Sequence, residues 1–356
     1  MDLGTGLLKC AVLEHLINDL ASSRPLTDEQ VDAAVDCLVD EQLAATTKAE
    51  FLSALARKGE TTGEIAAFAK ALRKKSVPVP IDPSTRAREI LDVVGTGGDQ
   101  LNTFNISTTV AILCSSAGIA VAKHGNRAIT SKCGSADVLE SLGVSVGLSP
   151  SEAAESLRDH HFAFFFAPNY HPAFKHIAPA RKLCAERGQR TIFNILGPLL
   201  NPAHPTAQLI GVPRPELCEP MARVVQALGS RRAMVVCGST PGGKLDELST
   251  LGENQIAEFY QERGFTVSGL SLDPFPLQRA TLADLTGGGR EENAKIVCRL
   301  LRGEDHGPKR DAVLLNAAAA LFVAGRTRSL IEGWDLAGRL IDDGAAMGKL
   351  TELGGH

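Results

Sequence analysis

The spacing of apolar residues in the first 75 positions predicts a compact bundle of helices. Between Leu8 and Leu20 apolar side chains recur every four residues, as they do on one face of an amphipathic helix. Three more helix starts are indicated by a threonine with Glu or Gln three residues later, the capping-box pattern, at Thr27, Thr47 and Thr61. We therefore expect a small helical domain over residues 1–75.

The pattern changes after a proline-rich segment. Residues 76–84 contain three prolines, which break helices, and this predicts a linker. From residue 85 to residue 356, helical patterns alternate with short apolar runs, which stand at 90–94, 119–122, 162–166, 209–212 and 233–236. This alternation predicts a large α/β domain with a central, mostly parallel sheet flanked by helices. We expect the helical segment 172–190 to join the small domain.

Composition excludes several classes of protein. The formal net charge is −4 and aromatic residues make up only 4%, so the chain lacks both the basic field and the stacking platforms that nucleic acids require. The sequence shows no signal-peptide pattern and no uninterrupted apolar stretch of membrane-spanning length. Its eight cysteines are scattered without a C-x-x-C pair, as is typical of buried, reduced thiols. We expect a cytoplasmic protein with no nucleic-acid or membrane partner.

A glycine-rich segment follows the first apolar run of the large domain. Residues 92–99 read Asp-Val-Val-Gly-Thr-Gly-Gly-Asp, and such glycines let the backbone approach a ligand and point N–H groups at an anion. Asn105, Ser107 and Thr108 then open an apolar helix, whose N-terminus offers hydroxyls, N–H groups and the positive end of the dipole. An ordinary turn and an ordinary helix cap are the alternatives. Together, however, the two features favour a phosphate-binding site.

A second candidate segment leaves the next apolar run. Residues 123–137 include Lys123, His124, Arg127 and Lys132, together with several hydroxyl side chains and two glycines. A solvated run of charges is the usual alternative, but here an apolar strand and an apolar helix bound the segment. Open α/β sheets bind ligands at the carboxyl ends of their strands, and the Arg127 guanidinium can bind a phosphate through two parallel hydrogen bonds. The segment therefore predicts a polyphosphate site.

Two adjacent carboxylates, Asp246 and Glu247, are candidate metal ligands. Mg²⁺ typically takes one or two carboxylates together with phosphate oxygens of a substrate. Adjacent acids are also common on protein surfaces, so the residues alone leave a solvated pair open. The same alternative applies to a basic helical stripe, which consists of Arg181, Lys182, Arg187 and Arg190.

Taken in order along the chain, these motifs resemble those of the anthranilate phosphoribosyltransferase family. The matching segments are GTGGD at 95–99, NIST at 105–108, KHGNR at 123–127, GSAD at 134–137, TIFNILGPL at 191–199 and LDE at 245–247. The resemblance covers nearly the whole chain and implies the nucleoside-phosphorylase/phosphoribosyltransferase fold, usually as a homodimer. It also implies a Mg²⁺-dependent enzyme of tryptophan biosynthesis from chorismate, acting at its second step. Such an enzyme transfers the phosphoribosyl group of phosphoribosyl pyrophosphate (PRPP) to the amine of anthranilate, giving N-(5-phosphoribosyl)anthranilate and pyrophosphate.

The resemblance further implies which residues form the site. The residues that would bind PRPP are Gly95, Gly98, Asp99, Thr103, Asn105, Ile106, Ser107, Thr108, Lys123, His124, Gly125, Asn126, Arg127, Ala128, Ile129, Thr130, Ser131 and Ser135. The residues that would face anthranilate are Gly95, His124, Asn126, His171 and Arg181. The metal would be held by Ser107, Asp246 and Glu247.

Two segments depart from the family pattern. Residues 181–191 form a longer stretch than is usual, so Arg187 or Arg190 competes for the role of Arg181. Cys237 stands where the family commonly has a histidine, and the following loop, residues 239–244, is extended.

Two other functions remain open. A pyrimidine nucleoside phosphorylase shares the fold class but should carry different phosphate and base motifs. A non-catalytic, nucleic-acid-binding relative should carry a basic charge and degraded Lys-His-Gly-Asn or Asp-Glu motifs. The net charge of −4 and the intact motifs favour the transferase.

Overall fold

The computed structural model describes residues 3–128, 132–260 and 263–354, and the chain divides into two compact units. The helical unit comprises Met1–Val77 and Pro168–Leu200, and the α/β unit comprises Pro78–Ala167 and Asn201–His356. The predicted fold class, a helical N-terminal domain followed by a larger α/β domain with a mostly parallel sheet, is confirmed. In the part of the chain that is described, no helix is long and apolar enough to cross a membrane.

The helical unit begins with four amphipathic helices, α1 (Leu3–Ala21), α2 (Asp28–Leu38), α3 (Ala45–Lys58) and α4 (Thr62–Lys74). Thr27 and Thr61 form the predicted capping boxes at the starts of α2 and α4. The predicted box at Thr47 is wrong, because α3 already begins at Ala45 and Thr47 lies within its first turn. Two of the three helix starts could therefore be located from the capping pattern alone.

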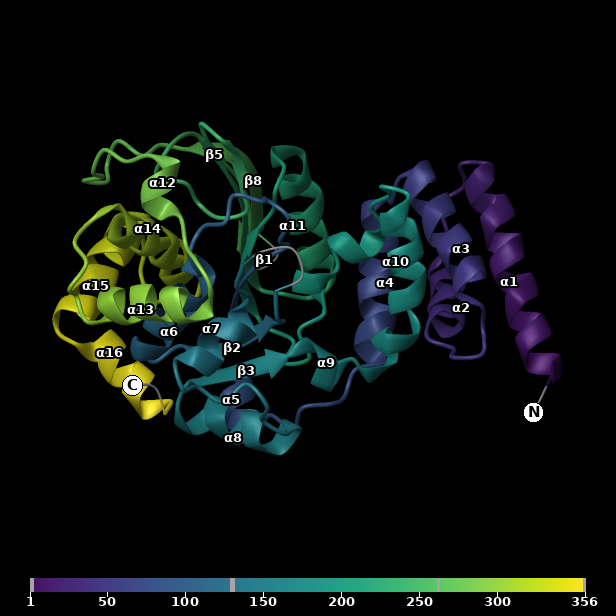
Figure 1. Cartoon of the computed structure of the whole chain (residues 1–356), viewed down its shortest axis with the longest axis horizontal. Coiled ribbons are helices and arrows are strands. Elements are labelled where there is room, and N and C mark those ends of the chain that lie inside the picture. The colour runs from purple at the N-terminus through teal and green to yellow at the C-terminus, as the bar shows by residue number, and fades with distance from the viewer. Residues whose placement is uncertain (1–2, 129–131, 261–262, 355–356) are drawn as a thin grey trace. The chain divides into compact units, whose positions relative to one another are not determined.

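The later part of the helical unit returns to pack against these helices. It consists of α9 (Ala167–Tyr170), η1 (Pro172–His176), α10 (Ala178–Glu186), η2 (Ile192–Asn194) and η3 (Gly197–Leu199). Helix α10 lies against α3 (Figure 1). Lys48 of α3 is only 1% exposed, and its Nζ donates hydrogen bonds to the carbonyls of Asp40 and His176. This buried ammonium therefore ties the N-terminal helices to the segment that carries α10.

The α/β unit is built on one sheet, whose described strands are ordered β3-β2-β1-β4-β5-β7-β8, with β6 paired to β5. The five predicted apolar runs form the parallel strands β1 (Ile90–Gly95), β2 (Ala120–Gly125), β3 (Phe162–Phe166), β4 (Ala207–Gly211) and β5 (Arg232–Thr240). The antiparallel strands were missed because polar and apolar residues are interspersed along them; they are β6 (Gly243–Leu245), β7 (Asn254–Tyr260) and β8 (Arg263–Leu270).

Helices cover both faces of this sheet (Figure 1). Helices α6 (Ile106–Ser116) and α14 (Pro308–Val323) pack against the parallel strands on one side, and α11 (Cys218–Ala227) packs against β5 and β7 on the other. The other helical elements of this unit are α5 (Pro83–Arg86), α7 (Ser135–Ser141), α8 (Pro150–Asp159), η4 (Pro215–Leu217), α12 (Leu282–Leu285), α13 (Arg290–Leu301), α15 (Leu330–Asp342) and α16 (Ala345–Glu352). Most residues of α14 are buried, so it is an interior helix.

The register of the parallel strands brings their carboxyl ends to one edge of the sheet. Gly95 at the end of β1 pairs with Gly211 at the end of β4, and Gly125 of β2 pairs with Phe166 of β3. The two segments predicted to bind phosphate both leave the sheet at this edge, which is where parallel α/β sheets bind their ligands.

Replacing Lys48 by Met should lower the free energy of unfolding by about 2 kcal/mol, because two carbonyls lose a charged donor while the apolar stem is kept. Urea unfolding followed by circular dichroism measures this change. Lys74→Met is the matched control, since the Lys74 ammonium pairs with Asp32 at the surface, and it should leave the midpoint nearly unchanged. A Lys48→Met midpoint equal to that of the wild type would contradict the assigned role.

Candidate active site

Glycines at the ends of two strands let one loop lie directly against the sheet edge. This acidic loop, residues 246–249, contains the predicted metal ligands. A Cβ atom at Gly211 would stand 1.5 Å from the backbone oxygen of Asp246, and one at Gly95 would stand 2.5 Å from an Asp246 carboxylate oxygen. Any side chain at Gly211 would therefore displace the acidic loop, and one at Gly95 would displace the Asp246 carboxylate.

The glycine loop, residues 95–99, lies beside the acidic loop. It passes through two left-handed positions, with φ of 72° at Gly97 and 97° at Gly98, which L side chains rarely adopt. The Gly97 N–H donates a hydrogen bond of 2.7 Å to Asp246 Oδ2. The two loops are thus joined by a hydrogen bond as well as by close contact.

Three carboxylates meet where these loops join. Burial, followed by the charge of Asp99, raises the pKa of Asp246 to about 7. Burial, followed by the charge of Asp246, also raises the pKa of Glu247 well above its usual range. Like charges held together in this way favour the binding of a cation. Among the described residues, no group of three or more His, Cys, Asp and Glu side chains has the arrangement of a metal site.

The start of α6 provides polar groups next to the acidic loop. The Ser107 N–H donates a hydrogen bond to the Glu247 carboxylate. Thr108 is fully buried, yet its Oγ1 has no hydrogen-bond partner among the residues that the structure describes. The Thr96 hydroxyl in the glycine loop, which was not among the predicted PRPP ligands, is also buried without a hydrogen-bond partner among the described residues. Since buried hydroxyls are rarely left without a partner, both indicate a place for ligand oxygens.

Asn105, a predicted PRPP ligand, is held from two sides rather than capping α6 with its side chain. Its Oδ1 accepts a hydrogen bond of 2.8 Å from Asn293 Nδ2, and its Nδ2 donates one of 3.3 Å to the Cys133 carbonyl. Asn293 in turn accepts the Gly288 N–H over 2.7 Å. Asn293, near the start of α13, therefore holds the Asn105 side chain and the Gly288 backbone together.

Lys123 is the buried cation of the site, at 2% exposure. Its Nζ donates hydrogen bonds of 2.7 Å to a carbonyl of β1 and of 3.3 Å to Ser107 Oγ. Burial lowers the pKa of this ammonium, while the charges of Asp92 and Glu247 oppose that shift. An ammonium placed here can neutralise part of a polyphosphate without leaving the protein interior.

Asp92 stands behind Lys123 and is fully buried. Burial raises its pKa to about 6, against the opposing effect of Lys123. Asn201 Nδ2 donates a hydrogen bond of 2.8 Å to Asp92 Oδ2 and one of 2.7 Å to the Ala122 carbonyl. Asn201, which no motif singled out, therefore fixes the carboxylate that faces the buried lysine.

The basic loop, residues 123–137, is closed by a single carboxylate. Asp137 Oδ2 accepts hydrogen bonds of 2.9 Å from the N–H groups of both Ala128 and Gly134. Ser135 approaches the start of the loop so closely that a Cβ at Gly125 would stand 2.2 Å from its Oγ. Side-chain and backbone contacts thus draw the two ends of this loop together.

Arg127, a predicted PRPP ligand, lies against two acidic side chains in this structure. It forms ion pairs with Glu140 at 2.6 Å and Asp137 at 3.2 Å, and it lies 5.6 Å from the centre of the Phe166 ring. Both acids belong to α7, so this side chain holds the basic loop to that helix. The predicted residues Ile129, Thr130 and Ser131 lie outside the described part of the chain.

The residues predicted to face anthranilate are divided between the two units. Gly95, His124 and Asn126 belong to the α/β unit, where His124 is buried and Asn126 is exposed. His171 and Arg181 belong to the helical unit. Burial lowers the pKa of His171 to about 4, which keeps its ring neutral at physiological pH.

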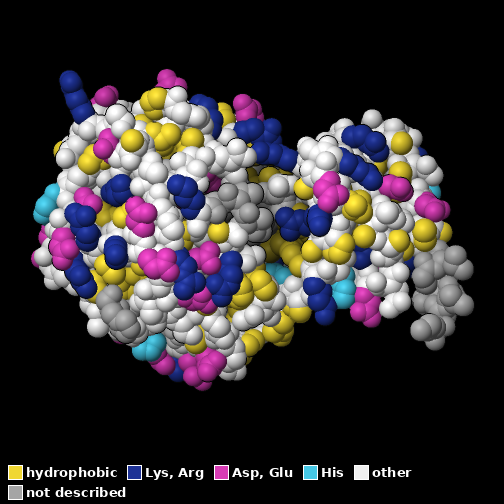
Figure 2. All heavy atoms as spheres, viewed as in Figure 1, with side chains coloured by type: hydrophobic (Ala, Val, Ile, Leu, Met, Phe, Trp, Pro, Cys, Tyr) yellow, Lys and Arg dark blue, Asp and Glu magenta, His cyan; other side chains and the backbone are white. Residues whose placement is uncertain are grey.

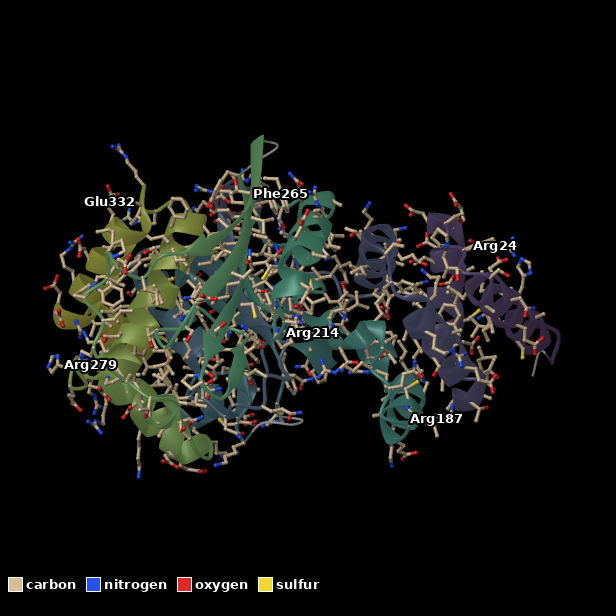
Figure 3. The ribbon with its side chains drawn as sticks, turned by 90° about the horizontal axis from the view of Figure 1, so that it is seen from above. Arg24, Arg187, Arg214, Phe265, Arg279 and Glu332 are labelled. Carbon is tan, nitrogen blue, oxygen red and sulfur yellow. The ribbon has the colours of Figure 1, made fainter. Side chains whose placement is uncertain are left out.

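An aromatic cluster surrounds Arg181 in the helical unit. Its guanidinium lies 5.4 Å from the centre of the Phe193 ring, and Phe174 packs edge-on against Phe193 and beside His171. Burial lowers the pKa of Arg181. Arg187 and Arg190, the competing residues, are both exposed, and Figure 3 shows Arg187 at the end of α10. Of the three arginines, Arg181 alone has the surroundings of a partly enclosed site.

The face of the molecule drawn in Figure 2 carries basic and acidic side chains interspersed with one another. This mixture agrees with the net charge of −4 and offers no continuous basic surface on that face for a polyanion.

Residues 87–347 match the family described as the glycosyl transferase family, a/b domain, and residues 14–76 match its helical bundle domain. The chain is 45% identical over 342 residues to the anthranilate phosphoribosyltransferase of Lacticaseibacillus casei and 42% identical over 342 residues to that of Petrotoga mobilis. Each of these alignments covers 96% of both chains. The similarity therefore extends over both units.

Solved structures show the same likeness. The anthranilate phosphoribosyltransferase of Thermus thermophilus superposes with a TM-score of 0.86 at 40% identity, covering 95% of this chain and 98% of that one. That of Saccharomyces cerevisiae, in complex with PRPP and Mg, superposes with a TM-score of 0.85 at 29% identity, covering 97% of each chain. These proteins carry the transferase's name rather than that of either alternative that the sequence left open. The chain belongs to the anthranilate phosphoribosyltransferase family.

Proposed function

We propose that this chain transfers the phosphoribosyl group of PRPP to the amine of anthranilate, releasing pyrophosphate. The observation that carries the proposal is the junction of the glycine loop and the acidic loop at the sheet edge, where the Gly97 N–H meets Asp246. A loop suited to phosphate and a pair of carboxylates suited to a divalent cation are there in contact. A substrate that carries a polyphosphate with a bound metal ion uses both.

The PRPP polyphosphate would lie between the glycine loop, the start of α6 and Lys123. The unpartnered Thr96 and Thr108 hydroxyls and the buried Lys123 ammonium supply donors to phosphate oxygens. Asp246 and Glu247, with Ser107 beside them, would hold Mg²⁺ together with substrate oxygens, and the raised pKa values of both carboxylates fit a place where a cation belongs. When bound, Mg²⁺ neutralises charge on the departing pyrophosphate.

The reaction does not require a strong base. The aromatic amine of anthranilate is unprotonated at neutral pH and attacks C1 of the ribose directly. The C1–N bond forms as the C1–O bond to pyrophosphate breaks, and the nitrogen then loses a proton. Holding both substrates in line, and neutralising the leaving group with Lys123, accelerates such a step.

Anthranilate would be recognised by its carboxylate and its ring. The half-buried Arg181 guanidinium offers a charge-assisted hydrogen bond to the carboxylate, and Phe193 and the neutral His171 ring offer apolar surface near it. The sequence also predicts Gly95, His124 and Asn126, which belong to the α/β unit, as anthranilate contacts. We also expect the protein to be cytoplasmic and to form a homodimer. Light scattering of the purified protein tests the oligomeric state.

Loss of anthranilate fluorescence on mixing the purified protein with PRPP and Mg²⁺ tests the activity. The signal should fall only when all three components are present, and pyrophosphate should appear in equal amount. Phosphorolysis of thymidine or uridine should be undetectable. Turnover of a nucleoside without turnover of anthranilate would replace this proposal with the phosphorylase.

Replacing Gly98 by Val should raise the PRPP dissociation constant at least about tenfold, because a β-branched side chain is strained at φ of 97° and the loop must refold away from the phosphates. Calorimetry in the presence of Mg²⁺ measures this. Gly147→Val is the control, since Gly147 lies in a loop of the same unit with no atom near its Cβ position. Unchanged PRPP affinity in Gly98→Val would show that the glycine loop is an ordinary turn and does not bind PRPP.

Replacing Arg181 by Ala should raise the anthranilate KM by about tenfold or more and leave the PRPP KM within about twofold, since one charge-assisted contact to one substrate is lost. Steady-state kinetics with each substrate varied in turn separate the two constants. Arg187→Ala, at the exposed end of α10, should behave as the wild type. If Arg187→Ala or Arg190→Ala shows the effect instead, the anthranilate carboxylate is bound elsewhere along this segment.

The double variant Asp246→Asn/Glu247→Gln should shift the Mg²⁺ activation curve to higher concentration and lower kcat, while the anthranilate KM changes little. Because two negative charges beside a polyanion are removed, PRPP binding without metal should tighten. The adjacent exposed acids at the end of α15, changed as Asp342→Asn/Asp343→Asn, form the control. An unshifted Mg²⁺ curve with wild-type turnover would show that the pair is not a metal site.

A further inference from the structure

The last two residues of the acidic loop are each bound by a buried asparagine. Asn316 of α14 accepts the Leu248 N–H at Oδ1 and donates from Nδ2 to the Leu248 carbonyl, both over 2.9 Å. Asn254, at the start of β7, makes the same pair of bonds with Ser249, over 2.7 and 2.9 Å. In each case an amide side chain takes the place that a neighbouring strand would occupy in a sheet.

Helix packing alone does not account for the amide at position 316. Asn316 is 0% exposed and is flanked on α14 by apolar residues from Ala312 to Leu321. Burying an amide costs free energy unless its groups are hydrogen-bonded, whereas a leucine of similar volume would pack here without that requirement. The bonds to Leu248, with one more from Nδ2 to the Ala312 carbonyl, satisfy the amide.

Charge repulsion explains why the acidic loop needs such support. Asp246 and Glu247 lie beside Asp99, and the ionised forms of these carboxyl groups repel one another, which opposes the charged arrangement that a cation requires. The loop also lies so close to β5 that a Cβ at Gly238 would stand 2.6 Å from the Glu247 backbone oxygen. Hydrogen bonds to the two following residues oppose any movement of the carboxylates away from the sheet.

We propose that Asn316 and Asn254 are positioning residues, which hold the Asp246 and Glu247 carboxylates in the arrangement that receives a divalent cation together with the polyphosphate. They act through the backbone of the acidic loop and touch neither substrate nor cation. The inference rests on the proposed function, which assigns the cation to these carboxylates.

The variant Asn316→Leu tests this role. Calorimetric titration of PRPP at a series of Mg²⁺ concentrations should show half-maximal binding at about tenfold more Mg²⁺ than in the wild type, as is common when a residue behind a metal ligand is lost. The Mg²⁺ activation curve of turnover should shift in parallel. The anthranilate KM should stay within about twofold, because the anthranilate contacts are untouched.

Val323→Ala is the matched control, since it removes buried apolar atoms at the far end of the same helix. It should lower Tm and leave the Mg²⁺ dependence unchanged. An equal Mg²⁺ shift in Val323→Ala would mean that destabilising α14 is sufficient, and would overturn the assigned role. If Asn316→Leu does not fold, Asn254→Ala is measured in the same way with the same expectation.

The outcomes separate this inference from the function on which it rests. An unshifted Mg²⁺ curve in a folded Asn316→Leu or Asn254→Ala overturns the positioning role. A wild-type protein that neither binds PRPP with Mg²⁺ nor consumes anthranilate overturns the proposed function instead.

Discussion

The site depends on the absence of side chains at the ends of two parallel strands. Because Gly211 lacks a Cβ, the backbone of Asp246 lies against the sheet edge at a distance that no other residue would permit, and Gly95 beside it leaves room for the Asp246 carboxylate. The sheet register places these two glycines opposite each other, so one close contact involves two strands at once. The carboxylates thereby reach the glycine loop and the start of α6, and the polar groups of three separate segments act on one substrate.

In this arrangement the buried charged groups have unfavourable electrostatic energy, which the binding of a substrate and its cation would lower. Burial and mutual repulsion raise the pKa values of Asp246 and Glu247, and burial lowers that of Lys123. A polyphosphate with a divalent cation supplies positive charge to the acids and negative charge to the lysine. Buried amides, among them Asn201 and Asn316, fix these charged groups without adding charge of their own. Pre-organisation of this kind lets binding energy be used for the reaction rather than for arranging the site.

Sequence patterns were sufficient for the two units and the parallel strands, because each of these strands contains a short apolar run and several helices begin at a capping residue. The family followed from six motifs in order. The sequence could not show that the Arg127 guanidinium pairs with α7, because its acidic partner Glu140 resembles any surface acid. Nor could it show what Asn201 and Asn316 bind, since a single asparagine in an apolar segment gives no indication of the backbone group or carboxylate that it contacts. Such roles depend on tertiary contacts alone.

The variant Gly211→Ala tests the central claim most directly, because its Cβ would stand 1.5 Å from the Asp246 backbone oxygen and must move the acidic loop off the sheet edge. The measurement is calorimetric titration of PRPP into the folded variant in the presence of Mg²⁺, with circular dichroism to confirm the fold. The account predicts that Mg²⁺-dependent PRPP binding is lost although the secondary structure is intact. PRPP binding with wild-type affinity and wild-type Mg²⁺ dependence would contradict it.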